Sequence, residues 1–130
     1  MKGFDLGSLE SADTTVVDLL HPATGEPIGA TITVYSKDSE ICRAARRKAE
    51  AKFLEFSRKH GGKKYMPAED REKLDLAADV ASVQSWDGLT EKGKALECTQ
   101  ANVLSIFERF PCFREQCKEA TEDRALFIKS

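Results

Sequence analysis

The sequence predicts an α+β fold, mainly helical, in which an N-terminal β-hairpin is followed by about four α-helices. Three observations lead to this prediction. Residues 31–35 (TITVY) alternate polar and apolar side chains, as a half-buried strand does. Four later stretches repeat apolar residues at the 3.6-residue spacing of a helix. Glycines and prolines separate several of the stretches.

The length and composition fit one domain overall. With 130 residues, 41% of them apolar, the chain is long enough to bury a core without disulfides or metal. Along the chain we expect a flexible N-terminal arm or short leading strand over 1–13. The β-hairpin and a long basic helix follow over 14–60, then a linker over 61–67 and a helical C-terminal part over 68–130.

The hairpin is expected to consist of strands at 14–20 and 31–35. The connection 21–29 contains two prolines and two glycines, which are typical of a loop. The alternation places Ile32 and Val34 on the inner face and the threonines outside. Because a two-stranded sheet is only marginally stable, we expect it to lie on a helix or on another subunit.

The first helix is expected from Ser39 to His60. Its apolar positions fall on one stripe at helical spacing: Ile41, Ala45, Ala49, Phe53 and Phe56. Gly61 and Gly62 are expected to end it.

The second helix is expected over 68–85, where acidic residues occupy the first turn and favour the positive end of the helix dipole. Trp86 is expected at the end of this helix, before an Asp-Gly turn. It either pins the helix to the core or anchors a partner protein. Residues 91–98 are expected to form a charged, irregular connection.

Two shorter helices complete the predicted fold. Thr99 can cap a helix over 100–110, and Pro111 suits the first position of the next one. These helices and the tail after them share an aromatic stripe: Phe107, Phe110, Phe113 and Phe127. Such a short chain has more apolar faces than one core needs, which favours self-association or a partner.

No constellation of catalytic or cofactor-binding residues appears. The glycine pair at 25 and 29 lacks the Lys-Ser/Thr that a phosphate-binding loop requires, and no nucleophile elbow is present. No two of the four cysteines have zinc-site spacing. We therefore expect no enzyme, no metal and no cofactor. Reduced cysteines are expected, with pairing of Cys98 to Cys112 or Cys117 as the alternative.

The charge distribution is uneven although the net charge is only −2. Residues 43–64 hold nine Lys or Arg and two acids, whereas residues 1–42 hold seven acids and two bases. A basic helix can follow a phosphate backbone. Residues 99–130 have five acids and five bases, however, which argues against a DNA-recognition helix. We expect the basic face to complement acidic segments of this chain or of a neighbouring subunit, and nucleic acid is not the expected partner. No apolar run approaches a membrane span, so no membrane association is expected.

A series of short motifs resembles one protein family. In chain order they are Leu20–Ile28 (LHPATGEPI), Tyr35–Ser39 (YSKDS), Arg43–Arg47 (RAARR), Trp86–Leu89 (WDGL), Thr99-x-x-Asn102-Val103, Phe110-Pro111 and Phe127. Their order and spacing resemble the tail assembly chaperones of tailed bacteriophages, a minor tail or tail assembly protein family. The resemblance covers residues 17–128.

The resemblance implies a non-enzymatic protein that works in the host-cell cytoplasm during virion assembly. It implies binding to the phage tape-measure protein, which is kept soluble while the tail-tube protein assembles around it. A homo-oligomer that is absent from the mature virion is expected. The alternatives are a structural virion component, such as a tail-completion or head–tail joining protein, and a small nucleic-acid-binding regulator.

Contacts with partners or between subunits are expected at large apolar side chains, because these dominate interface energies. The candidate residues are Ile32, Val34, Phe53, Phe56, Trp86, Phe107, Phe110, Phe113 and Phe127.

Overall fold

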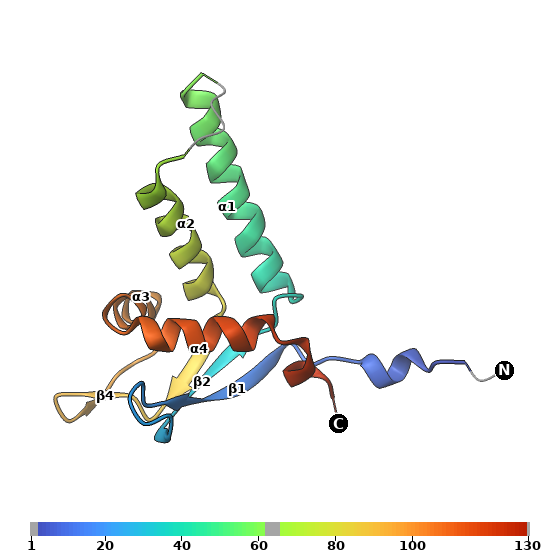
Figure 1. The fold of residues 1–130 in the computed structure, drawn as a ribbon, viewed down its shortest axis with the longest axis vertical. Coiled ribbons are helices and arrows are strands. Elements are labelled where there is room, and N and C mark those ends of the chain that lie inside the picture. Colours follow the sequence, from blue (N-terminus) through green and yellow to red (C-terminus); the bar gives the residue numbers. More distant parts are fainter. Residues whose placement is uncertain (1–2, 62–65, 130) are drawn as a thin grey trace.

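The computed structural model describes residues 3–61 and 66–129. Within these ranges the chain forms four α-helices, a three-stranded antiparallel sheet and a small two-stranded sheet. Helix α4 (Pro111–Glu122) lies across one face of the large sheet, and helices α1 (Glu40–Lys59) and α2 (Ala68–Ala81) stand away from it as an antiparallel pair (Figure 1). The predicted α+β fold, mainly helical and with an N-terminal hairpin, is confirmed.

The large sheet has the order β1-β2-β3, with β2 (Pro27–Tyr35) at its centre. Strand β1 (Thr14–Leu20) pairs with β2 as the predicted hairpin, but β2 begins at Pro27, because Leu20 pairs with Pro27, so the loop predicted over 21–29 is shorter than expected. Ile32 and Val34 are fully buried, whereas Thr31 and Thr33, which alternate with them along β2, are half-buried. This is the expected difference between the two faces of the strand. The covering that the hairpin needs comes from helix α4 on one face and from a third strand along the free edge of β2.

That third strand, β3 (Val83–Asp87), corrects the prediction of a helix over 68–85 and of a helix-end position for Trp86. Helix α2 ends at Ala81, and the main-chain N–H and the hydroxyl of Ser82 both donate to the Asp79 carbonyl. The register of β2 and β3 shifts between Thr33 and Val34, so that Val83 and Trp86 both lie on the inner face. Because of this register shift, two inward-facing residues of the strand are three positions apart, a spacing that is also typical of a helix. This explains why the sequence predicted a helix up to residue 85.

The expected irregular connection 91–98 also contains regular structure. Strands β4 (Thr90–Glu91) and β5 (Lys94–Ala95) form a small hairpin. Its two turn residues, Lys92 and Gly93, both have positive φ, the geometry of a type I′ turn.

The remaining helices begin where the sequence predicts. The Ser39 hydroxyl accepts from the Cys42 N–H at 3.2 Å and caps α1. The Thr99 hydroxyl accepts from the Asn102 N–H at 3.1 Å and caps α3 (Gln100–Arg109). Pro111 occupies the start of α4. Helix α1 ends at Lys59, and Gly62, predicted to help end it, lies with most of the expected linker 61–67 outside the described residues.

One core lies between the sheet and the helices α3 and α4. Its buried residues are Leu19, Ala30, Ile32, Val34, Val103, Ile106, Phe107, Cys117, Ala120 and Phe127. Phe127 belongs to a short 3₁₀ helix, η2 (Arg124–Phe127), which packs beside β1. This core uses the aliphatic face of the sheet and most of the aromatic stripe.

Strand β1 is an edge strand, and helix α4 contacts its end. The Leu20 N–H donates to Oε1 of Gln116 at 2.8 Å, and Nε2 of Gln116 donates back to the Leu20 carbonyl at 3.0 Å. The side-chain amide thus bonds both main-chain groups of Leu20, as a neighbouring strand does.

The predicted N-terminal arm leaves the body beside the C-terminal segment. Ser11 forms a bridge with Ile128, and the Ala12 N–H donates to the Phe127 carbonyl at 2.7 Å. Beyond this anchor the described part of the arm, residues 3–10, contains one 3₁₀ turn, η1 (Leu6–Leu9), with no buried residue. Figure 1 shows it projecting away from the rest of the molecule.

Candidate partner-binding groove

Helix α2 packs against both α1 and α3, and side chains from all three helices line one groove of about 600 Å³. We call it the three-helix groove. Helix α1 supplies one stripe at helical spacing: Ile41, Ala44, Ala45, Lys48, Ala49 and Lys52. Three members of this stripe belong to the apolar stripe predicted for the first helix.

The part of the groove formed by α2 combines alanines with larger apolar side chains, among them Leu76 and Val80. Ala77, Ala78 and Ala81 lie there together with Leu74. Alanine side chains let a guest backbone approach closely, as small residues do wherever helices pack tightly. Helix α3 closes the groove with Ala101 and the exposed Leu104, while Ile41 is exposed on the α1 side.

Charged side chains border this apolar lining. Lys48 and Lys52 come from α1, Lys73 comes from α2, and Glu108 of α3 is the one acid among the lining residues. The groove thus offers an apolar floor with three ammonium groups and one carboxylate beside it. Such a surface suits an apolar stripe flanked by acidic groups.

Two polar ties hold the helices around the groove. Arg114 of α4 donates through Nε to Oδ2 of Asp79 on α2 at 2.6 Å and through Nη1 to Glu72. Hydrogen bonding to this guanidinium lowers the pKa of the Glu72 carboxyl. Arg114 and Asp79 are mostly buried, so this tie is shielded from water.

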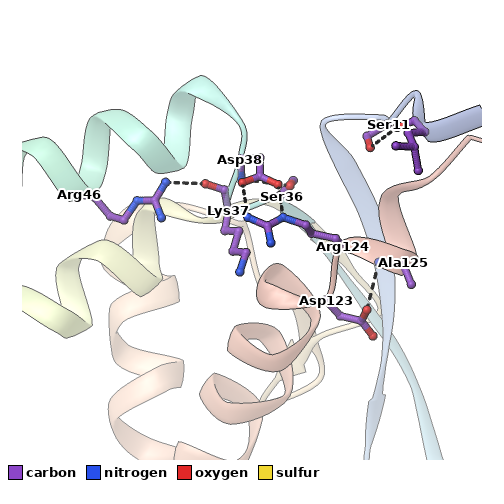
Figure 2. A network of polar contacts seen from close by, with 9 residues as sticks. Ser11, Ser36, Lys37, Asp38, Arg46, Asp123, Arg124 and Ala125 are labelled. Atoms are coloured by element: carbon purple, nitrogen blue, oxygen red, sulfur yellow. Dashed lines mark hydrogen bonds and ion pairs between the residues drawn. The ribbon is translucent and has the colours of Figure 1, made fainter. Parts of the chain in front are cut away.

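The second tie lies at the base of α1 (Figure 2). Arg124 of η2 donates to both carboxylate oxygens of Asp38, at 2.7 and 3.1 Å, and this hydrogen bonding lowers the pKa of Asp38. Arg46 of α1 donates to the Lys37 carbonyl at 2.9 Å. The segment before α1 is thereby joined to both α1 and the C-terminal 3₁₀ helix.

Part of the basic charge of α1 is paired within the helix. Glu40 lies near both Arg43 and Arg47, and hydrogen bonding to Arg47 lowers the pKa of the Glu40 carboxyl. Lys59 lies 3.2 Å from Glu55. Lys48 and Lys52 belong to the groove, so some cations of α1 form pairs within the helix and others border the groove, while Arg46 bonds the Lys37 carbonyl.

Four of the nine predicted contact residues are buried in the chain's own core: Ile32, Val34, Phe107 and Phe127. Their surfaces are used in folding and face no solvent. The core takes them because a domain of this size needs its largest apolar side chains to exclude water.

The other five lie at partly exposed positions and are not among the residues that line the groove. Trp86 is half-buried against the core, and its Nε1–H donates to the Leu96 carbonyl at 2.7 Å. Phe53 lies under the Arg71 guanidinium at 5.2 Å, and Phe56 stacks on His60. Phe110 and Phe113 contact each other with ring centroids 5.7 Å apart.

None of the residues that line the groove is among the nine predicted contacts, and alanine is the commonest residue type in the lining. The alanines at positions 44 and 101 are much smaller than the large apolar side chains that usually mark an interface, so they do not stand out in the sequence. A usable signal is that α1 and α2 both repeat alanine at helical spacing, a pattern that leaves a hollow where these two faces meet Ala101 of α3.

The four cysteines are free thiols and differ in burial. Burial, with a smaller effect of Asp79, raises the pKa of the Cys117 thiol to about 12. Burial also raises the pKa of Cys42 and of Cys98. Cys112 is half-buried at the start of α4.

We expect iodoacetamide to label Cys112 first and Cys117 last in the folded protein, because the thiolate is the reacting form. Peptide mass spectrometry over a time course measures the order, and guanidinium-unfolded protein, in which all four thiols react alike, is the control. Equal native labelling rates at Cys112 and Cys117 contradict the prediction.

The same thiol makes stability depend on pH. Since the unfolded thiol of Cys117 ionises near pH 9 and the folded one near 12, its contribution to stability is lost as the pH rises above 9.

Within residues 3–61 and 66–129, no group of three or more His, Cys, Asp or Glu side chains is arranged to hold a metal ion. No helix in the same ranges has the length and apolar character needed to cross a membrane. Comparison with protein-family models, curated proteins and solved structures gives no match.

Proposed function

We propose that this chain is a tail assembly chaperone of a tailed bacteriophage. In this proposal it is not an enzyme, it acts in the host cytoplasm, and it is absent from the mature virion. It binds helical segments of the tape-measure protein in the three-helix groove, keeps that protein soluble and promotes assembly of the tail-tube protein around it. The observation that carries the proposal is the groove, and the ordered motifs along residues 17–128 give its biological context.

The groove has the properties that a helical client needs. A long helix with an apolar stripe aggregates until that stripe is covered. An alanine-lined floor admits the backbone of such a helix, and the exposed Ile41 and Leu104 contact its apolar side chains. Lys48, Lys52 and Lys73 favour a helix whose apolar stripe is flanked by acidic residues.

One groove covers only a short part of an elongated client. A chaperone of this kind therefore binds many sites along one partner, and several weak contacts give a stable complex through avidity. Two basic side chains of α1 form ion pairs within the helix: Arg47 with Glu40 and Lys59 with Glu55. Because less positive charge is then available for a phosphate backbone, these pairs weigh against the alternative of a nucleic-acid-binding regulator.

Co-expression with the tape-measure protein of the same phage tests the proposal, with client solubility and the mass of the complex as readouts. Wild-type chain is expected to yield a soluble complex containing several copies. Ala44→Glu places a longer, charged side chain inside the groove and is expected to weaken client binding at least tenfold, because it fills space that the client needs and pairs with Lys48, which then no longer attracts the acidic groups of the client.

Ala51→Glu is the matched control, since Ala51 is also exposed on α1 but lies outside the groove lining. It is expected to bind the client as wild type does. Equal effects of the two substitutions reject the groove as the site. Failure of the wild-type chain to bind any tape-measure segment rejects the function, and stoichiometric copies in purified particles favour a structural virion component.

A further inference from the structure

We infer that the chain self-associates by arm exchange: the N-terminal arm of one copy docks in the three-helix groove of a second copy. The inference concerns an interface between copies of this chain and does not depend on the identity of any client. Four observations support it: the exposed apolar side chains of the arm, its fixed shape, its charge and its direction.

The arm presents large apolar side chains to solvent. Phe4, Leu6 and Leu9 are 70%, 75% and 54% exposed, and no residue of the 3₁₀ turn is buried. Three such side chains within six residues expose apolar surface whose burial in an apolar site is favourable. The small side chains along the groove leave the space that they need.

The arm has a defined shape before it binds. The Asp5 carboxylate accepts from the Gly7 N–H at 2.9 Å, and the Ser8 hydroxyl donates to the Asp5 carbonyl at 2.8 Å. The Lys129 N–H donates to the Glu10 carbonyl at 2.9 Å and fixes the base of the arm. A segment that is already ordered loses less conformational entropy on docking than a disordered one.

The charges of the two surfaces are opposite. Residues 1–13 contain three acids and one base; Asp5 lies between Phe4 and Leu6, and Glu10 directly follows Leu9. Three lysines and one glutamate border the groove. Direct pairing of two grooves instead brings like-charged lysines together, so arm-to-groove contact is the favourable arrangement for two copies.

The direction of the arm favours a second copy over the groove of the same chain. The arm is anchored beside Ile128 and projects on the side of the molecule away from α3, one wall of the groove (Figure 1). The resulting contact is heterologous: each copy offers one arm and one groove. Repetition of such a contact yields a ring or an open chain of subunits.

Sedimentation equilibrium of the full chain without a client tests the inference. The wild-type mass is expected to rise above the 14.4 kDa of one chain as concentration increases, and salt is expected to weaken the association. The triple substitution Phe4→Ser, Leu6→Ser and Leu9→Ser removes only exposed side chains and is expected to give a 14.4 kDa species. Ala44→Glu in the groove is expected to do the same, and Ala51→Glu is expected to associate as wild type does.

Mixing the arm variant with the groove variant is the decisive measurement. The arm variant retains a groove and the groove variant retains an arm, so the mixture is expected to form one complex of twice 14.4 kDa and nothing larger. Wild type that stays at 14.4 kDa at every concentration overturns the inference. An arm or groove variant that associates like wild type also overturns it. Because no client is present, these outcomes leave the proposed function untouched.

Discussion

Replacing Phe107 by alanine is expected to lower the free energy of unfolding by about 3–5 kcal/mol. Phe107 is only 2% exposed and is among the largest fully buried side chains of the core. Its removal loses the burial of an aromatic ring and leaves a cavity that the surrounding sheet and helices fill only in part. Denaturant unfolding followed by circular dichroism measures the loss.

Phe110 provides the matched comparison, since it lies three residues further along the same predicted aromatic stripe but is 38% exposed. Phe110→Ala is expected to cost about 1 kcal/mol, because its ring contacts mainly Phe113 and the Arg109 guanidinium. Losses of similar size at the two positions contradict the assignment of Phe107 to the core and of Phe110 to the surface.

Replacing Gly88 by alanine is expected to cost about 3 kcal/mol, the second of the two largest effects. Gly88 follows strand β3 with φ +85°, and a Cβ atom there lies 2.7 Å from the Gly29 carbonyl oxygen and 3.1 Å from the Ala30 Cα. Both neighbours are main-chain atoms of the central strand, so neither moves without disturbing the sheet. Thermal unfolding measures the loss.

Gly93 separates the two contributions to this effect. Its φ is +78°, close to that of Gly88, but no heavy atom lies within 4 Å of a Cβ at this position. Gly93→Ala therefore tests the backbone conformation alone and is expected to cost about 1 kcal/mol. Equal losses at Gly88 and Gly93 show that the close approach to β2 contributes nothing.

Much of the fold follows from local features that leave a clear mark on the sequence. Ser39, Thr99 and Pro111 mark helix starts because capping and proline geometry act within a few residues. The alternation of Ile32 and Val34 with threonines gives the two faces of β2. These signals need no knowledge of the rest of the chain.

Strand β3 does not follow from local features, because its pairing with β2 is a long-range contact. Val83 and Trp86 have helical spacing, and only the register shift opposite Thr33 and Val34 turns both toward the core. The short hairpin around Gly93 was missed for a different reason: its strands have two residues each, too few for any periodicity.

The candidate site was the least predictable part of the molecule. Large apolar residues such as Phe107 and Phe127 were expected at interfaces, but a small domain buries its largest side chains first. The groove instead arises where Ala44, Ala77 and Ala101 converge from three helices. Its position depends on how those helices pack, which no single stretch of sequence records.

The two hydrogen bonds between the Gln116 side-chain amide and the main chain of Leu20 have a consequence for a protein that is proposed to bind aggregation-prone clients. Unpaired edge strands are templates on which other chains add as further strands and grow into fibrils. Gln116 occupies both main-chain groups of Leu20 at one end of β1, and the Ser11–Ile128 bridge occupies the chain just before its other end. An incoming strand finds only a short central stretch between these two blocks, so this edge is protected against the uncontrolled addition of further strands.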